Sequence, residues 1–199
     1  MTNSYDSCVV NKIVNGKQLT VVWHVDDLKI SHVDAAVVDE FIAQLDSKFG
    51  RETPMNKSRG KIHDYLGMVL DFSVSGKVTI DMREYVRMVL HDLPPNMIGK
   101  ANTPAANYLF DINNDSKPLD STNKEIYVHY VMQLLYLNQR GQPDIRTAIS
   151  FLCTRLQNPD EDDYKKLIRV LKYLQQTDDM TLVLCADASF PLIWWVDAS

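Results

Sequence analysis

Two adjacent aspartates interrupt an apolar stretch in the segment Leu19-Thr20-Val21-Val22-Trp23-His24-Val25-Asp26-Asp27-Leu28-Lys29-Ile30-Ser31. The residues on both sides of the acidic pair are mainly β-branched, aromatic or aliphatic, which favours two short strands at 19–24 and 28–31. Because so few residues separate these strands, the chain must reverse in a tight turn. We therefore predict a β-hairpin with the two carboxylates at its tip.

The flanking residues extend this hairpin into a small unit. Upstream, a β-branched segment at 8–14 ends at the Asn-Gly pair of positions 15–16, which accepts the positive φ angles of a two-residue hairpin turn. Downstream, apolar residues recur with helical spacing between Asp34 and Gly50. This spacing predicts a helix that is capped by Asp34, ends at Gly50 and lies across the hairpins.

The middle of the chain predicts one more hairpin and one more helix before a long loop. Apolar segments at 65–70 and 78–80 flank the turn signal Ser75-Gly76, and Asp81 then opens an amphipathic helix. Prolines and many Asn, Asp and Ser residues follow between positions 93 and 122. We expect a long loop or linker there and place the main domain boundary in it.

The remaining part of the chain is mainly helical by its pattern. Apolar periodicity predicts one helix at 124–139, a second over 143–156 and a third from Asn158-Pro159 onward. Acidic residues come first and basic residues later in the third helix, which suits the helix dipole and indicates a structural role. Two segments near the C-terminus, 182–185 and 193–197, return to strand character.

Composition places the chain among globular proteins, and we expect it to be intracellular. Of 199 residues, 45% are hydrophobic and 24% are charged, which is typical of proteins with a packed core. The polar N-terminal residues do not resemble a signal peptide, and no apolar run is long enough for a membrane span. The 3 cysteines are too scattered for a disulfide framework, and Gly-rich dinucleotide and P-loop motifs are absent from the sequence.

Charge along the chain gives a mixed indication about nucleic acid. The 21 basic and 26 acidic side chains give a net charge of -5, which argues mildly against binding a phosphate backbone. Between positions 48 and 61, however, basic residues outnumber acidic ones, and Lys57, Arg59 and Lys61 fall in this segment. The segment is either a solvated loop or a loop that contacts phosphates.

The adjacent Asp26 and Asp27 admit two interpretations. An Asp-Asp pair is found in polar turns, where it needs no ligand. Like charges at the tip of an apolar hairpin also repel unless a cation is bound, and hard carboxylate oxygens suit Mg²⁺. Two-metal phosphoryl or nucleotidyl transfer uses carboxylates in this way, because the ions activate the attacking oxygen and stabilise the leaving oxygen.

The sequence around the acidic pair resembles the palm hairpin of reverse transcriptases, whose pattern Tyr-x-Asp-Asp corresponds here to His24-Val25-Asp26-Asp27. Over its whole length the chain is similar to the reverse transcriptase of copia-type retrotransposons, with the matching segments in the same order. These segments include Phe49-Gly50, Tyr65-Leu66-Gly67, Ile80-Asp81, Tyr85, Thr103-Pro104, Leu134-Leu135-Tyr136-Leu137, Pro143-Asp144-Ile145, Lys172-Tyr173-Leu174 and Trp194-Trp195-Val196-Asp197-Ala198.

The resemblance implies an α+β fold in four parts. Residues 1–93 would form the C-terminal part of the palm, with antiparallel hairpins, the primer-grip region and the following helix. Residues 94–122 would be a linker, 123–180 a helical thumb and connection region, and 181–199 the first strand of a ribonuclease H-like domain. The family's fingers and another catalytic Asp belong upstream of this region. We therefore expect the chain to be a fragment that is inactive alone.

The resemblance also implies RNA-directed DNA polymerisation by two-Mg²⁺ nucleotidyl transfer within a retrotransposon polyprotein. Asp26 and Asp27 would be the catalytic residues and hold Mg²⁺ or Mn²⁺, and Asp197 would be a metal ligand of the ribonuclease H domain. His24 stands where the family has a Tyr beside the incoming nucleotide and the primer. The other residues expected to contact nucleic acid are Lys57, Arg59, Lys61, Tyr65, Leu66 and Gly67.

The implied partners are an RNA template, a DNA primer or duplex, deoxynucleoside triphosphates and the rest of the polyprotein. No membrane is expected, and the implied location is a cytoplasmic virus-like particle or the nucleus. Two alternatives stay open: a relic that at most binds nucleic acid through the 48–61 loop, or a different Mg²⁺-dependent phosphotransfer enzyme that uses Asp26 and Asp27. Isolated histidines such as His63 and His129 are expected to be structural.

Overall fold

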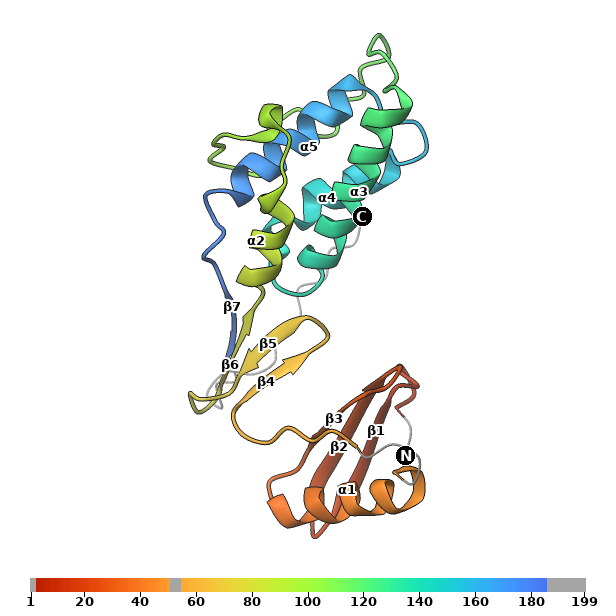
Figure 1. Ribbon diagram of the computed structural model, residues 1–199, viewed down its shortest axis with the longest axis vertical. Coiled ribbons are helices and arrows are strands. Elements are labelled where there is room, and N and C mark those ends of the chain that lie inside the picture. The colour runs from red at the N-terminus through yellow and green to blue at the C-terminus, as the bar shows by residue number, and fades with distance from the viewer. Residues whose placement is uncertain (1–2, 51–54, 186–199) are drawn as a thin grey trace. The chain divides into compact units, whose positions relative to one another are not determined.

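The computed structural model describes residues 3–50 and 55–185, and the chain divides into two compact units (Figure 1). The first unit is Met1–Leu66 and the second is Gly67–Ser199. Both units combine helices with antiparallel strands, so the described residues have a mixed helix and sheet architecture.

Three antiparallel strands form the sheet of the first unit in the order β1-β2-β3. They are β1 (Val9–Val14), β2 (Lys17–His24) and β3 (Asp27–Ser31). The turn between β1 and β2 has positive φ at both Asn15 (51°) and Gly16 (72°), which is the geometry that its Asn-Gly sequence predicts. Both hairpins that the sequence predicts in this region are confirmed.

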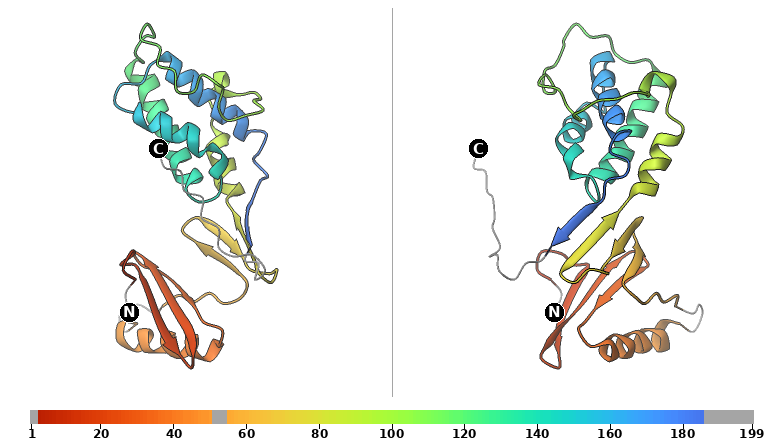
Figure 2. Two further views of the ribbon diagram at one scale, coloured as in Figure 1. Left: turned by 180° about the vertical axis from the view of Figure 1, so that it is seen from behind. Right: turned by 90° about the vertical axis from the view of Figure 1, so that its left-hand side faces the viewer.

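Helix α1 (Ala35–Phe49) lies against one face of this sheet (Figure 2). Its N-cap Asp34 accepts a hydrogen bond from a backbone N–H of the first turn. Val37 on the helix is buried together with Leu19 and Val21 of β2, and these side chains are the centre of a small apolar core. The predicted cap, the helix and its position across the hairpins are confirmed.

Strand β4 (Ile62–Tyr65) ends the first unit, and the turn residues that follow it, Leu66 and Gly67, have φ angles of 50° and 69°. The hairpin predicted around Ser75-Gly76 is confirmed, since Leu70 pairs with Ile80, but the segment 65–70 is not one strand, because two successive residues with positive φ cannot continue a strand. Strand β5 (Met68–Asp71) begins only after the turn, in the second unit.

In the second unit, β5 pairs with β6 (Lys77–Asp81), and β6 also pairs with β7 (Leu182–Cys185). Both pairings are antiparallel, and Ile80 of β6 lies opposite Leu70 of β5 and Leu182 of β7. The strand predicted at 182–185 is thus confirmed. It belongs to a sheet of the second unit, although β6 lies far upstream in the sequence.

Helices build the rest of the second unit, and they share one apolar core. The helical elements are α2 (Arg83–His91), η1 (Pro95–Met97), α3 (Ser121–Asn138), η2 (Pro143–Ile145), α4 (Arg146–Thr154) and α5 (Glu161–Leu174). Each α-helix contributes to the core, for example with Val86, Leu134, Ile149 and Leu171. The helical periodicity of this part of the sequence is confirmed.

Two details of this unit differ from what the sequence predicts. Asp81 does not open a helix but ends β6, and its carboxylate accepts a hydrogen bond from the backbone N–H of Arg83, where α2 begins. The proline-rich segment 94–122 is anchored in the core, because Met97 and Leu109 are 0% and 5% exposed. The compact units divide between Leu66 and Gly67 rather than in this segment.

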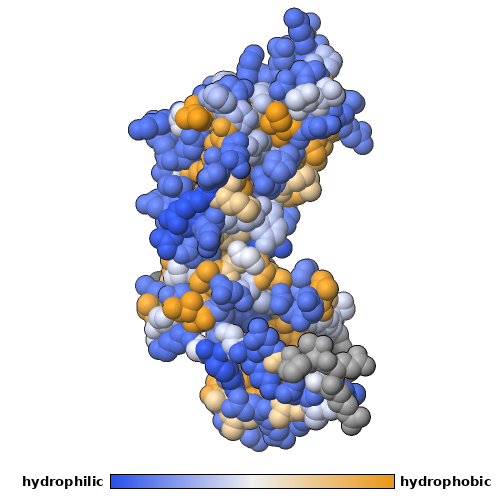
Figure 3. All heavy atoms as spheres, in the orientation of Figure 1, coloured by the Kyte–Doolittle hydropathy of each residue, from blue (hydrophilic) through white to orange (hydrophobic). Residues whose placement is uncertain are grey.

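The surface of the second unit is mostly hydrophilic on the face drawn in Figure 3, and apolar side chains occur there in separate small groups. Exposed apolar side chains of this unit include Met88, Phe110 and Met132. Among the described residues, no helix is both long enough and apolar enough to cross a membrane.

Candidate active site

The turn between β2 and β3 carries the acidic pair. His24 and Asp27 are cross-strand partners, so Val25 and Asp26 form a two-residue turn between them. Val25 has a φ angle of 53° and is 87% exposed. A β-branched residue in the left-handed region is unfavourable by about 1–2 kcal/mol. Such strain persists only where the surroundings impose it, and it is frequent at functional turns.

Side chains that alternate along the strands give this sheet a helix-covered face and an open face. Leu19 and Val21 of β2 are buried with α1, which turns His24 to the opposite side of the sheet. Asp27 lies opposite His24, and Lys29 follows two residues later on β3, so both share the open face. Asp27, a predicted catalytic residue, and His24, a predicted nucleic-acid contact, therefore form a cross-strand pair at the end of this face.

Further polar side chains continue the open face away from the turn. The Gln18 amide donates hydrogen bonds to Asn11 Oδ1 (3.1 Å) and Thr20 Oγ1 (2.9 Å), and the Thr20 hydroxyl donates to Asn11 Oδ1 (2.9 Å). Lys29 is half-buried, and this burial lowers the pKa of its ammonium group. Beside the acidic turn, the open face thus presents hydrogen-bonding groups and a lysine, which suit a polar ligand.

Tyr65 of β4 joins this group from a distant part of the sequence. Burial is the main cause that raises the pKa of its phenol, and the charges of Asp27 and Cys8 raise the pKa further. The Asp27 carboxylate is therefore close enough to Tyr65 to interact with it electrostatically. The fold brings together four of the predicted site residues: His24, Asp26, Asp27 and Tyr65.

The acidic turn fits Mg²⁺ by its donor chemistry. Among the described residues, no group of three or more His, Cys, Asp or Glu side chains could hold a metal ion. Mg²⁺, however, is usually bound through one or two carboxylates, with waters and substrate phosphates as further ligands. Asp26 and Asp27 meet this smaller requirement. Asp197, the third predicted ligand, lies outside the described residues with the rest of the strand predicted at 193–197.

Two cations of the basic segment have carboxylate partners on α1. Lys57 Nζ lies 2.8 Å from Asp46 Oδ2, and Arg59 pairs with Asp39. The hydrogen bond from Lys57 is the main cause that lowers the pKa of Asp46. Lys61 is exposed and forms no ion pair with the part of the chain that the structure describes. Because exposed ion pairs are weak, phosphates can compete for these cations, and their contact with nucleic acid stays a prediction.

Gly67, a predicted primer contact, has a structural reason to be glycine. Its φ angle is 69°, and a Cβ atom at this position would lie only 2.7 Å from the Tyr136 hydroxyl oxygen. The Tyr136 ring lies beside Tyr85, with ring centroids 5.0 Å apart, and the Arg140 guanidinium lies 3.8 Å from its centroid. The contact of Leu66 and Gly67 with a primer strand stays a prediction.

The histidines that were expected to be structural have local partners. A ring nitrogen of His63 lies 2.9 Å from the Gly60 carbonyl oxygen, and the His129 ring meets the Tyr130 ring edge-on with centroids 5.3 Å apart. The strained Val25 is the residue of the candidate site that sequence reasoning missed. A β-branched residue in a two-residue hairpin turn is the signal that identifies it.

Related sequences are found among known proteins at low identity. The chain is 28% identical over 185 residues to YCL074W of Saccharomyces cerevisiae, a protein named for the transposon Ty5-1. It is 26% identical over 157 residues to AtMg00810, an uncharacterized mitochondrial protein of Arabidopsis thaliana. The alignments cover 90% and 79% of this chain, and 56% and 61% of the two relatives.

The chain therefore spans less than two thirds of the length of these relatives. No protein-family profile matches the chain, and no solved structure matches it. The chain is therefore similar, at low identity, to a protein named for a transposon.

Proposed function

We propose that the chain contributes the catalytic hairpin and the helical region of an RNA-directed DNA polymerase, the reverse transcriptase of a copia-type retrotransposon. Two independent observations support this proposal. The likeness to a transposon protein extends over 90% of the chain, well beyond the acidic motif. The second observation is the conformation of the turn that carries Asp26.

The strained turn at Val25 and Asp26 is the observation that carries the proposal. The neighbouring hairpin has Asn15-Gly16 in its turn, the pair that adopts positive φ with little strain. The second hairpin instead has a valine at φ 53° directly before the acidic pair. A turn that keeps this strain beside two carboxylates is better explained by a functional constraint on its shape than by stability.

In this proposal the residues of the turn and of the open face have distinct roles. Asp26 and Asp27 would hold Mg²⁺ beside the phosphates of a deoxynucleoside triphosphate. Bound there, the metal would supply positive charge that stabilises the attacking and leaving oxygens. The open face receives the RNA template and DNA primer, with Lys29 facing phosphates and His24 facing the primer end. The phenol of Tyr65 beside Asp27 offers a hydrogen-bond donor, and its raised pKa favours the protonated form further.

Ion binding can be tested on the 199-residue chain itself. Paramagnetic Mn²⁺ accepts the same oxygen ligands as Mg²⁺ and broadens the NMR signals of nearby nuclei. We expect Mn²⁺ to broaden the backbone amide signals of residues 24–28 first, and Asp26→Asn to prevent this. Glu40→Gln is the matched control, because it removes an exposed carboxylate from α1, on the other side of the sheet. Equal broadening in wild type and Asp26→Asn would contradict the ion site.

Polymerase activity requires a second assay, primer extension on an RNA template, in a longer protein that contains this chain. Asp26→Asn should lower the rate by more than about tenfold, since it removes a metal ligand. The fold should survive, because Asn is as compatible with turns as Asp. Glu40→Gln should leave the rate unchanged. Near-normal extension by the Asp26→Asn variant would overturn the proposed function.

A further inference from the structure

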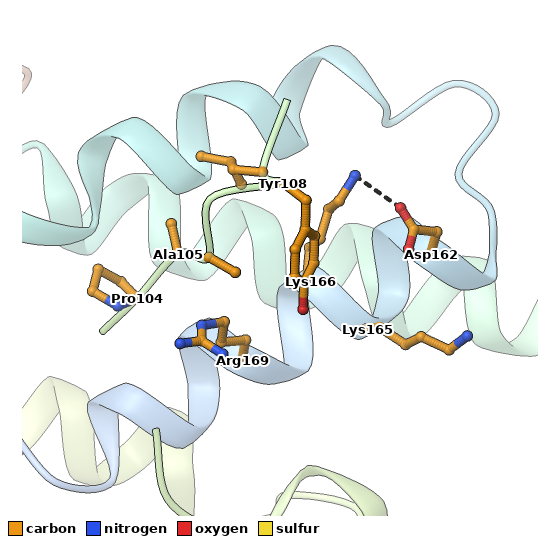
Figure 4. Close-up of a pocket in the computed structure, with 9 residues that line it drawn as sticks. Pro104, Ala105, Tyr108, Asp162, Lys165, Lys166 and Arg169 are labelled. Atoms are coloured by element: carbon orange, nitrogen blue, oxygen red, sulfur yellow. Dashed lines mark ion pairs between the residues drawn. The ribbon is translucent and has the colours of Figure 1, made fainter. Parts of the chain in front are cut away.

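A second candidate site lies in the other unit, between the segment 104–109 and helix α5 (Figure 4). It is a pocket with a volume of about 170 Å³. Apolar side chains of the segment form one wall, and charged side chains of α5 form the other; the residues that matter here are Pro104, Ala106, Asp162, Lys165, Lys166 and Arg169. Three cations and one carboxylate therefore surround a small cavity.

Lys166 is a charged side chain built into this pocket, since the residue is only 5% exposed. Its ammonium nitrogen lies 2.8 Å from Asp162 Oδ2 and donates a hydrogen bond to the Asp111 carbonyl oxygen at 2.6 Å. An ammonium group has three N–H donors, so these two partners leave one donor for another acceptor. The pair of Lys166 with Asp162 is neutral as a whole. The charges of Lys165 and Arg169 are not compensated, so the pocket has a net charge of two positive units.

Arg169 has hydrogen-bonding capacity that the described part of the chain does not use. Its terminal Nη2 group donates to the Thr103 hydroxyl at 2.9 Å, and no carboxylate of the described residues pairs with its charge. Its Nε atom is buried and has no hydrogen-bond partner among the described residues. A buried donor without a partner is unfavourable, so it points to a missing acceptor.

The size and the charge of the pocket define that acceptor. The N-terminus of α5 is already capped by Asp160, so the cations, not the helix end, attract the ligand. A volume of about 170 Å³ is smaller than the roughly 300–1,000 Å³ of pockets that enclose a whole small-molecule ligand. The pocket therefore suits a single compact group. Two uncompensated cations and an arginine fork favour a dianionic phosphate over a carboxylate or chloride.

We propose that this pocket binds a dianionic phosphate group, with Arg169 and Lys166 as its hydrogen-bond donors and Lys165 as a further charge at the rim. Figure 4 shows Arg169 below Pro104 and Ala105, the Lys166 ammonium directed toward Asp162, and the Lys165 side chain extending away from both. Inorganic phosphate and the terminal phosphate of a nucleotide or a polynucleotide share this chemistry. The site uses none of the residues of the acidic turn.

Titration of the full chain with inorganic phosphate, followed by NMR of backbone amides in residues 103–109 and 162–169, tests the proposal. We expect saturable shifts in these two segments, and an affinity that falls about tenfold or more in Arg169→Gln, as for the loss of a charge-assisted hydrogen bond. Lys172→Gln is the matched control: it removes one positive charge from the same helix, outside the pocket. Asp26→Asn should bind phosphate normally.

Ala106→Leu supplies a second test of phosphate binding. It leaves the charge of the pocket unchanged but fills the cavity that Ala106 and Arg169 line, so it should weaken phosphate binding. Melting curves identify any variant that fails to fold. A 5′-phosphorylated oligonucleotide and its 5′-hydroxyl counterpart, each added in competition with inorganic phosphate, distinguish the two sources of the phosphate group. Competition by the phosphorylated form alone indicates a terminal phosphate of a polynucleotide, and competition by neither indicates free phosphate. Absence of saturable binding, or equal weakening by Arg169→Gln and Lys172→Gln, would overturn the proposal.

Discussion

Replacement of Gly67 by alanine should destabilise the second unit by about 2–4 kcal/mol. Alanine at φ 69° adopts a left-handed conformation that is unfavourable by about 1–2 kcal/mol. The added Cβ atom would also lie 2.7 Å from the Tyr136 hydroxyl oxygen, and overpacking of this kind is unfavourable by about 1–3 kcal/mol. Alanine restricts the unfolded chain, which offsets about 0.4–1 kcal/mol of this loss.

The contact with Tyr136 can be separated from the backbone effect by a double-mutant cycle in urea denaturation. Tyr136→Phe removes the hydroxyl oxygen and leaves the next ring atom at 3.7 Å, an ordinary van der Waals distance. In this background, Gly67→Ala should destabilise by only about 1 kcal/mol. Gly16→Ala in the first unit is a reference for the backbone effect alone, because its φ is 72° and nothing lies within 4 Å of the new Cβ.

Two results would refute this reasoning. An equal loss of stability in both backgrounds would show that the Tyr136 hydroxyl does not restrict Gly67. A loss below about 0.5 kcal/mol, the size of an ordinary surface effect, would show that neither the φ angle nor the contact requires glycine. Gly67 would then be explained by contact with a ligand rather than by the fold.

Three further predictions concern other strained or charged positions. Val25→Asn should raise the free energy of unfolding of the first unit by about 1 kcal/mol, because Asn tolerates φ of 53°; an unchanged urea midpoint would contradict the strain. Asp163→Ala should lower the stability of the second unit by about 1–3 kcal/mol, measured by calorimetry, because Arg155 Nε loses its partner at 3.0 Å while Nη2 keeps Asp160 at 3.3 Å; a loss below about 0.5 kcal/mol, the size of a surface effect, would sink this reasoning. The hydrogen bond from Arg83 holds the pKa of Asp81 below its usual value. This contribution to stability is present above the unfolded pKa of about 4 and lost as the pH falls through the folded value. Asp81→Asn should therefore make the acid-induced loss of stability shallower, and an identical pH profile would contradict this.

The two hairpins and the helix of the first unit could be predicted because their signals are local. The Asn15-Gly16 pair permits positive φ at two successive positions, and this alone sets the turn of the first hairpin. Asp34 caps α1 through a hydrogen bond to the adjacent turn, which depends only on neighbouring residues. Apolar spacing then selects the helix face that covers Leu19 and Val21.

Predictions failed where two local signals competed. The segment 65–70 has the apolar composition of a strand, but Leu66 and Gly67 adopt positive φ and divide it. Asp81 is a residue type that caps helices, yet its backbone is used by β6, opposite Val69 of β5. Pairing with the other strand of the predicted hairpin decided the outcome at Asp81, and no local signal sets how far along the chain that pairing extends.

The sequence by itself determined the acidic turn, the caps and the apolar faces, because each depends on residues that are close along the chain. Only the tertiary structure decided that Tyr65 lies near Asp27, that Lys57 pairs with Asp46, and that Met97 anchors a proline-rich segment in the core. The physical reason is that burial and electrostatic interaction act through space. A residue's charge partner and exposure follow from how separate elements pack, and no periodicity in the sequence encodes which distant residue that packing brings near.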